Sequence, residues 1–413
     1  MAGEPNPHAP ITAGRLFPWL RLLPAVAAAA DPKRLVLAAL GLVLLHLGWE
    51  GLGRLFPHSG AITPPVPSAT VAMDMGGWRA SSLTPRLLQP PAPAFPEDRA
   101  SIAADLRSAP WRLTEPVRYL VGPFLGTFSV RSDGWTFLHA LSTALWGVVV
   151  WSPLGGAIAR VAVVQAARAE RVGLPEALRF AVRKAVPLLA APLSPMVGVA
   201  FFAALCAAFG LLYRIPAPVG PTVAGALAPL PLLAGLTMAL ILLGLAAGWP
   251  LMPVAVAAEA EDGFDALSRS YAYVHQRPGP YAAYALLAWG LGIVGLILVD
   301  LFARVVVGLA EWGLSFAAPG DLLAMLFGSA PPHRGADPDP TAAALHTFWL
   351  SAVGLLAHAW IYSYFWTSAA TIYLLLRRDV DGTAWHDIAL ADRAAPAPAP
   401  SPSPESDAHA STA

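Results

Sequence analysis

The sequence predicts an all-α protein, a polytopic bundle of about six transmembrane helices. Hydrophobic residues make up 56% of the 413-residue chain and charged residues only 13%, whereas soluble domains carry about 25% charged residues. Several apolar runs exceed the roughly 20 residues that a helix needs to cross a bilayer. The lipid bilayer is therefore the first partner that we expect. The formal net charge is zero, which argues against a nucleic-acid partner.

Signatures of catalysis and of cofactor binding are missing from the sequence. Cys206 is the single cysteine, which excludes an intramolecular disulfide and a thiolate metal cluster. No Walker A, G-x-S-x-G, H-E-x-x-H or C-x-x-C pattern occurs. Residues 290–295 imitate a dinucleotide fingerprint, but they lie inside an apolar run with no strand before them, so we interpret them as close helix packing. We expect no cofactor and no enzymatic activity.

The chain divides into five parts along its length. Residues 1–34 form an N-terminal segment with an amphipathic lead-in helix, and residues 35–56 form the first span. Residues 57–134 are expected to form an extracytoplasmic segment that is rich in proline, alanine and serine up to about residue 98 and then forms short helices. No core of an independent domain is visible there. Residues 135–390 form a five-span bundle. Residues 391–413 are low in complexity and are expected to be a disordered tail.

The spans of the bundle cover about 135–164, 186–212 and 223–256, and two more begin near 281 and 345. All are longer than the minimum, so we expect tilted or kinked helices.

Basic residues indicate how the spans are oriented. They are concentrated before the first span, between the second and third, between the fourth and fifth, and after the sixth. The short alternate loops, 213–222 and 318–344, hold only Arg214 and Arg334. Under the positive-inside rule, this distribution predicts an inner-membrane protein with both termini in the cytoplasm.

Two of the cytoplasmic loops, 165–187 and 259–278, share one pattern and predict a repeated elbow helix. In each, a glycine is followed by an acid, Ala-Leu, an arginine, an aromatic residue and a proline that opens the next span. We expect the glycine to end one helix. The acid should lie in the first turn of a short new helix and pair with the arginine on the same face. Chance similarity between alanine-rich segments is the alternative explanation.

The elbow pattern and the terminal stretch RRDVDGTAWHDI resemble a family of uncharacterised bacterial multi-pass inner-membrane proteins. The pattern is more distantly similar to the membrane region of glycerophosphodiester phosphodiesterases. The resemblance covers residues 135–300 or so and its motif is loose. Because no phosphodiesterase catalytic domain accompanies it, the resemblance implies a fold and not an activity.

Ionisable residues inside spans are costly and are therefore candidates for function. His46 and Glu50 are four residues apart, a spacing that suits a proton relay or two metal ligands, while Glu50 could instead pair with Arg54 near the end of the span. Asp300 and Arg304 have the same spacing, which suits an interfacial salt bridge or a solute site. The elbows add the candidates Arg168, Arg171, Arg179, Asp265, Arg269, Tyr271 and His275.

We expect these features to make a non-catalytic scaffold or partner-binding module, which contacts another membrane or cytoplasmic protein through its elbow helices. The alternative is a permease for a small solute or a lipid. In that case the third and fourth spans would be broken by prolines such as Pro192, Pro195 and Pro250, as at the midplane sites of transporters.

Overall fold

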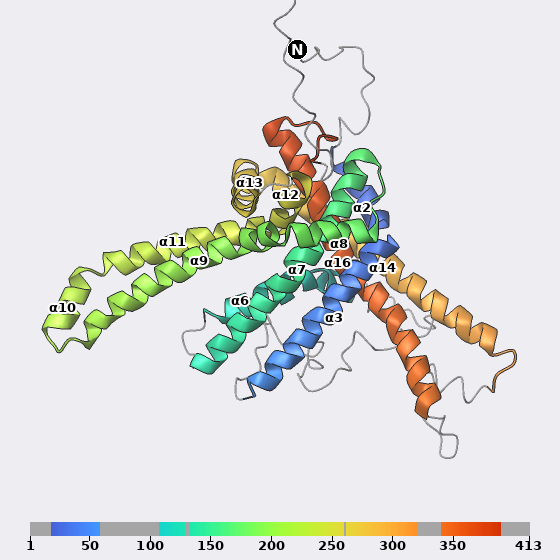
Figure 1. The fold of residues 1–413 in the computed structure, drawn as a ribbon, viewed down its shortest axis with the longest axis horizontal. Helices are drawn as coiled ribbons and strands as arrows, with labels where there is room; N and C mark the ends of the chain where they lie inside the picture. Colours follow the sequence, from blue (N-terminus) through green and yellow to red (C-terminus); the bar gives the residue numbers. More distant parts are fainter. Residues whose placement is uncertain (1–17, 58–106, 129–132, 260–261, 320–339, 390–413) are drawn as a thin grey trace, which may run out of the picture.

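The computed structural model describes residues 18–57, 107–128, 133–259, 262–319 and 340–389 (Figure 1). These residues are largely helical and contain no β-strand, so the all-α prediction is confirmed. A helical stretch at 107–113 precedes α6. The other elements are η1 (Pro18–Leu22), α2 (Leu23–Ala28), α3 (Pro32–Leu55), α6 (Glu115–Gly126), α7 (Gly134–Arg168), α8 (Leu174–Arg183), α9 (Ala185–Gly210), η3 (Leu211–Arg214), α10 (Val219–Ala226), α11 (Pro229–Gly248), η4 (Trp249–Leu251), α12 (Met252–Glu259), α13 (Gly263–Gln276), α14 (Pro278–Leu314) and α16 (Pro340–Asp381).

Three helices form the centre of the molecule. Residues 154–164 of α7, the whole of α12 and residues 359–376 of α16 hold long runs of buried side chains. These segments are apolar around most of their circumference, the pattern of a helix that other helices enclose. Helices α2, α3, α8, α9, α13 and α14 pack around them. We call this region the hub. It consists of α12 and the second halves of α7 and α16, with α2, α8 and α13 packed around them.

The long helices diverge from the hub (Figure 1). Helix α3, the first halves of α7 and α16 and the second half of α14 point away from it, and α9, α10 and α11 form a hairpin that extends to one side. The buried residues of α9 lie between Leu188 and Val199, and those of α11 between Gly244 and Gly248. The hairpin therefore packs against the rest of the protein only where it leaves the hub.

Five helices among the described residues are long and apolar enough to cross a membrane. They are 32–55, 134–168, 185–214, 229–259 and 278–314, which match the first five predicted spans. The sixth predicted span corresponds to α16, whose 42 residues are rich in aromatic and hydroxyl side chains. Many of these side chains are buried in the hub. The chain is thus an all-α membrane protein whose last long helix is buried in the hub over its second half.

Glycines allow aromatic rings to lie directly on neighbouring helices, which is the packing expected from the glycines at 290–295. A Cβ atom on Gly292 would come within 2.6 Å of the Tyr364 ring, and one on Gly295 within 2.5 Å of the Trp360 ring. On α11, a Cβ atom on Gly244 would lie 2.4 Å from the Tyr271 ring. Small residues at such crossings let helix backbones approach closely in membranes.

The prediction that prolines break the third span is wrong. Helix α9 continues through Pro192 and Pro195 without interruption. The lost N–H of Pro195 would leave the carbonyl of Ala191 without its usual donor, and the Ser194 hydroxyl donates to that carbonyl at 3.2 Å. In the fourth span, the break is displaced to its hub end, where the turn η4 contains Pro250 between α11 and α12.

The elbows form as short helices, but their ends differ from the prediction. Helix α7 ends at Arg168 with Ala169 in the left-handed conformation (φ 57°), so Gly173 does not end it. Gly173 instead caps α8, and its N–H donates to the Glu176 carboxylate at 3.4 Å. In the second elbow the Asp262 side chain caps α13, accepting from the N–H groups of Phe264 and Asp265. Both elbows therefore start with a carboxylate that binds free N–H groups.

Part of the segment 57–134 packs against the bundle. The predicted proline-rich linker, which extends to about residue 98, lies outside the described residues except for residue 57. Helix α6 packs along α7, and its Tyr119 is only 8% exposed.

Candidate functional site: an arginine pocket at the hub

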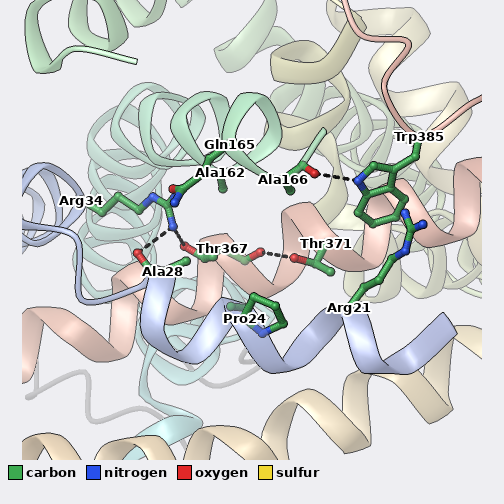
Figure 2. A pocket seen from close by; sticks show the side chains of 11 residues that line it. Arg21, Pro24, Ala28, Arg34, Ala162, Gln165, Ala166, Thr367, Thr371 and Trp385 are labelled. Atoms are coloured by element: carbon green, nitrogen blue, oxygen red, sulfur yellow. Dashed lines mark hydrogen bonds between the residues drawn. The ribbon is translucent and has the colours of Figure 1, made fainter. Parts of the chain in front are cut away.

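A cavity of about 390 Å³ lies in the hub between α2, α7, α16 and the start of α3 (Figure 2). Its volume is in the range of ligand-binding pockets. Two guanidinium groups, two hydroxyls, an amide and an indole face it, and none of its lining residues is acidic. The lining residues are Arg21, Pro24, Ala25, Ala28, Arg34, Ala162, Gln165, Ala166, Thr367, Thr371 and Trp385.

Arg34 lies in the first turn of α3 and is fully buried. Its guanidinium donates to the carbonyl of Ala28 at 2.7 Å and to the Gln165 side chain, and more weakly to Thr367 Oγ1 at 3.4 Å. All of these acceptors are neutral. Among the described residues, the Nε–H of Arg34 has no hydrogen-bond partner. A buried arginine is ordinarily paired with a carboxylate. Asp31, the N-cap of α3, interacts with Arg34 electrostatically, but no carboxylate among the described residues forms an ion pair with it, so its charge is only partly balanced.

Arg21 lies at the other end of the cavity, stacked on an aromatic side chain (Figure 2). Its guanidinium carbon is 4.0 Å from the ring centroid of Trp385, a cation–π contact. Partial burial and the nearby positive charge of Arg378 both lower the pKa of Arg21.

The two ends of the pocket differ (Figure 2). Arg34, Gln165 and Thr367 converge at one end, the polar end, from α3, α7 and α16. The opposite end is lined by the Trp385 ring with Arg21 stacked on it and by the exposed residues Pro24 and Ala166. Such a cavity suits a ligand that carries a compact negative group at one end and an apolar body at the other.

The segment that follows α16, residues 382–389, crosses the hub and closes one side of the pocket; we call it the strap. Its Trp385 indole donates to the carbonyl of Ala166 at 2.7 Å. Arg160 on α7, 5% exposed, donates at 2.7 Å both to the carbonyl of Ala389 and to that of Ala257 on α12. Arg377 donates to the carbonyl of Asp387. The strap is thus held mainly through its own backbone oxygens.

Three of the elbow candidates are engaged in internal contacts. Arg168 donates to the strap carbonyl of Ile388 at 3.3 Å. Arg269 forms its ion pair with Glu259 at 2.8 Å, so the prediction that it pairs with Asp265 is wrong. Glu259, at the end of α12, reaches Arg269 because the capping turn at Asp262 brings α13 back alongside it.

Tyr271 donates its hydroxyl to the carbonyl of Ile241 at 3.0 Å, and burial raises its pKa to about 12. The hydroxyl therefore stays protonated and acts as a fixed donor that ties α13 to α11. His275 is exposed and lies 2.9 Å from the carbonyl of Tyr271 through Nδ1. Arg171, Arg179 and Asp265 are exposed on the hub surface. The structure does not bring the elbow candidates together into a site.

The candidates within the spans have contacts that suit a structural role. Glu50 forms an ion pair with Arg54, which is the structural alternative to a site shared with His46. His46 bonds through Nδ1 to the carbonyl of Leu42 at 2.7 Å. Asp300 pairs with Arg112, from the stretch before α6, and the expected salt bridge to Arg304 is not the contact that forms. Segment 107–126 returns into the bundle, which the sequence did not indicate, and it brings Arg112 within reach.

The pocket residues were not among the sequence candidates. Arg21 and Arg34 entered the sequence argument only as positive charges before the first span. The signal that could have singled out Arg34 is its place after Pro32, which starts the helix and so puts the arginine inside the span. Nothing in the sequence links it to Gln165 or Thr367, which lie more than a hundred residues away.

Searches of family models, of curated proteins and of solved structures found no match to this chain.

Proposed function

We propose that this is a non-catalytic bacterial inner-membrane protein, with both termini in the cytoplasm, that acts by binding a small anionic ligand in the arginine pocket. This proposal is supported by the buried guanidinium of Arg34, which lines a cavity without acidic lining residues and donates hydrogen bonds only to neutral acceptors. A ligand that brings a negative charge would balance it.

The position of the pocket supports its access from the cytoplasm. Both elbows, the lead-in segment 18–28 and the strap 382–389 lie at the hub (Figure 1), and the elbows and the residues next to both termini are the arginine-rich loops of the sequence. Under the positive-inside rule that end faces the cytoplasm. Accessibility of single cysteines placed at the exposed positions 171 and 265 to a membrane-impermeant reagent in intact cells tests this orientation; labelling there would overturn it.

Binding of a small anion in the pocket is compatible with the expected role as a partner-binding module, because some elbow arginines remain exposed. Arg168, Arg269 and Tyr271 hold the hub together, which leaves Arg171 and Arg179 as exposed elbow arginines for a protein partner. The proposal of a permease has weaker support, because α9 is unbroken and packs directly against α11.

The proposal is tested by the effect of anions on the thermal unfolding of the full-length protein in detergent. A ligand at about 100 times its Kd stabilises the folded state by about 2.7 kcal/mol. Phosphate, sulfate and citrate should raise the melting temperature relative to chloride, whereas choline and spermidine should not. Arg21→Gln should weaken the effect, and the exposed Arg171→Gln should retain it. Equal shifts in both variants would contradict the pocket.

A further inference from the structure

We infer that the ligand is a phosphate ester, with its phosphate bound by Arg34, Gln165 and Thr367 and its organic body directed toward Trp385. This inference rests on the proposed function and narrows it to one chemical class. Its first support is the number of donors at the polar end of the pocket. Its second is the apolar surface at the other end, which a bare inorganic anion would not use.

Side chains from three helices meet at the polar end (Figure 2). The Nε–H of Arg34 has no partner among the described residues, but the atom is covered by its neighbours and does not reach the cavity. The Gln165 oxygen accepts from Arg34, which leaves the amide N–H groups of Gln165 as donors. The hydroxyl oxygen of Thr367 accepts from Arg34, which leaves its proton to be donated. A phosphate has three terminal oxygens to accept from such a set, while a carboxylate has two.

The remainder of the cavity favours an organic body on the phosphate. The cavity of about 390 Å³ is much larger than one anion, and beyond the polar end its walls include the apolar residues Pro24, Ala25, Ala166 and Trp385 together with Arg21 and Thr371. The free energy of binding becomes more favourable when an apolar group of the ligand displaces water from apolar surface in a pocket. Arg21 beside Trp385 adds a second cation near the mouth. The matching ligand is a phosphate monoester with an apolar or planar ester group.

Two sources can supply this chemistry, a soluble phosphate ester or the headgroup of a phospholipid. Arg34 is in the first turn of a membrane-spanning helix, close to the level of the headgroups. Arg21 and Trp385 belong to segments that are not spans, which leaves a path to water. The experiment therefore includes both sources.

Phenyl phosphate, benzoate and inorganic phosphate form a matched set of probes for the full-length protein in detergent, with calorimetry as the readout. Phenyl phosphate should bind about tenfold more tightly than either of the others, because only it offers both the phosphate and the ring. For the lipid source, the protein is reconstituted in nanodiscs of phosphatidylcholine with or without phosphatidic acid. Competition by phosphatidic acid against phenyl phosphate would identify a lipid ligand, and its absence a soluble one.

The decisive variant is Gln165→Glu. It preserves the size and the acceptor that binds Arg34, but it places a negative charge at the polar end. It should leave the protein folded and reduce phenyl phosphate affinity at least about tenfold, while Arg171→Gln keeps the affinity. Thr367→Val, which removes one donor, should reduce it less.

The outcomes separate the inference from the proposed function. Equal binding of benzoate and phenyl phosphate overturns the phosphate ester and leaves an anion site in place. Unchanged affinity in Gln165→Glu overturns the pocket as the site. Failure of all anions to bind overturns both.

Discussion

The arginine pocket and the cluster beside α6 bury charge in two different ways. Beside α6, acidic groups have basic partners: Glu115 Oε1 lies 2.9 Å from Nε2 of His358, and Asp300 forms an ion pair with Arg112. In the pocket, Arg34 is more deeply buried than any of these, yet it contacts only carbonyl, amide and hydroxyl oxygens.

The difference separates a structural clamp from a binding site. Removal of one partner from a buried pair leaves the other uncompensated, so paired charges hold segments together and offer nothing to a ligand. The α6 cluster joins the segment before the second span to α14 and α16 in this way. An unpaired charge beside a cavity remains able to bind a ligand of opposite sign.

Glu115→Ala should give the largest loss of stability, about 3 kcal/mol, because it removes one partner of a buried pair. Chemical unfolding of the detergent-solubilised protein measures the change. Glu50→Ala is the control: Arg54, its partner, has a side chain that is 76% exposed, and exposed pairs contribute about 0–1 kcal/mol. Equal losses in the two variants would mean that the α6 pair is not a clamp.

Gly244→Leu should destabilise the hub by about 1–3 kcal/mol, since the new side chain must displace the ring of Tyr271. Gly235→Leu on the same helix is the matched control, because a Cβ atom there has no neighbour within 4 Å. Thermal unfolding compares the two. If both melt at the same temperature, α13 does not pack on α11 through this glycine.

Gln165→Glu should raise stability by about 1 kcal/mol while it removes anion binding, because it supplies the carboxylate that Arg34 lacks. The sign of the change in stability is the test, because a new carboxylate should stabilise the protein only if the charge of Arg34 is not already balanced. A loss of stability, measured by unfolding in the absence of anions, would show that the contacts of Arg34 already balance its charge.

Trp385→Phe should have the smallest effect, about 0.5 kcal/mol, the low end of the range for a hydrogen bond. It removes the bond to the carbonyl of Ala166 but keeps a ring for Arg21. Phenyl phosphate affinity should change little, whereas Trp385→Ala should lower it. If both variants changed the affinity for phenyl phosphate equally, the ring of residue 385 would not form part of the ligand site.

The sequence allowed the fold to be predicted further than the site. Long apolar runs depend on neighbours along the chain, and the first five predicted spans correspond to helices α3, α7, α9, α11 and α14. The elbows also form as the short helices α8 and α13, but their ends and the partner of Arg269 differ from the prediction. The contacts of Arg34, Asp300 and Arg269 depend on segments far away in the chain. Asp300 was assigned to Arg304 on its own helix because no pattern in the sequence places Arg112 beside it.

Proline shows the same limit at a smaller scale. Residue type alone predicted a break at Pro195, but the neighbouring Ser194 supplies a donor to the freed carbonyl. The rule for proline is correct in isolation, and the local side chain decides its outcome in a membrane helix.

The way in which the strap is held has a consequence for how its sequence can change. Arginines on α7 and α16 bind the carbonyl oxygens of residues 387, 388 and 389, and every amino acid carries that oxygen. Apart from the pocket wall at Trp385 and the buried Ile388, its residues can therefore diverge freely among relatives, while its length cannot, since an insertion would move each carbonyl out of register with its arginine. A tag fused beyond residue 389 should accordingly be tolerated, whereas a single residue inserted after Trp385 should not.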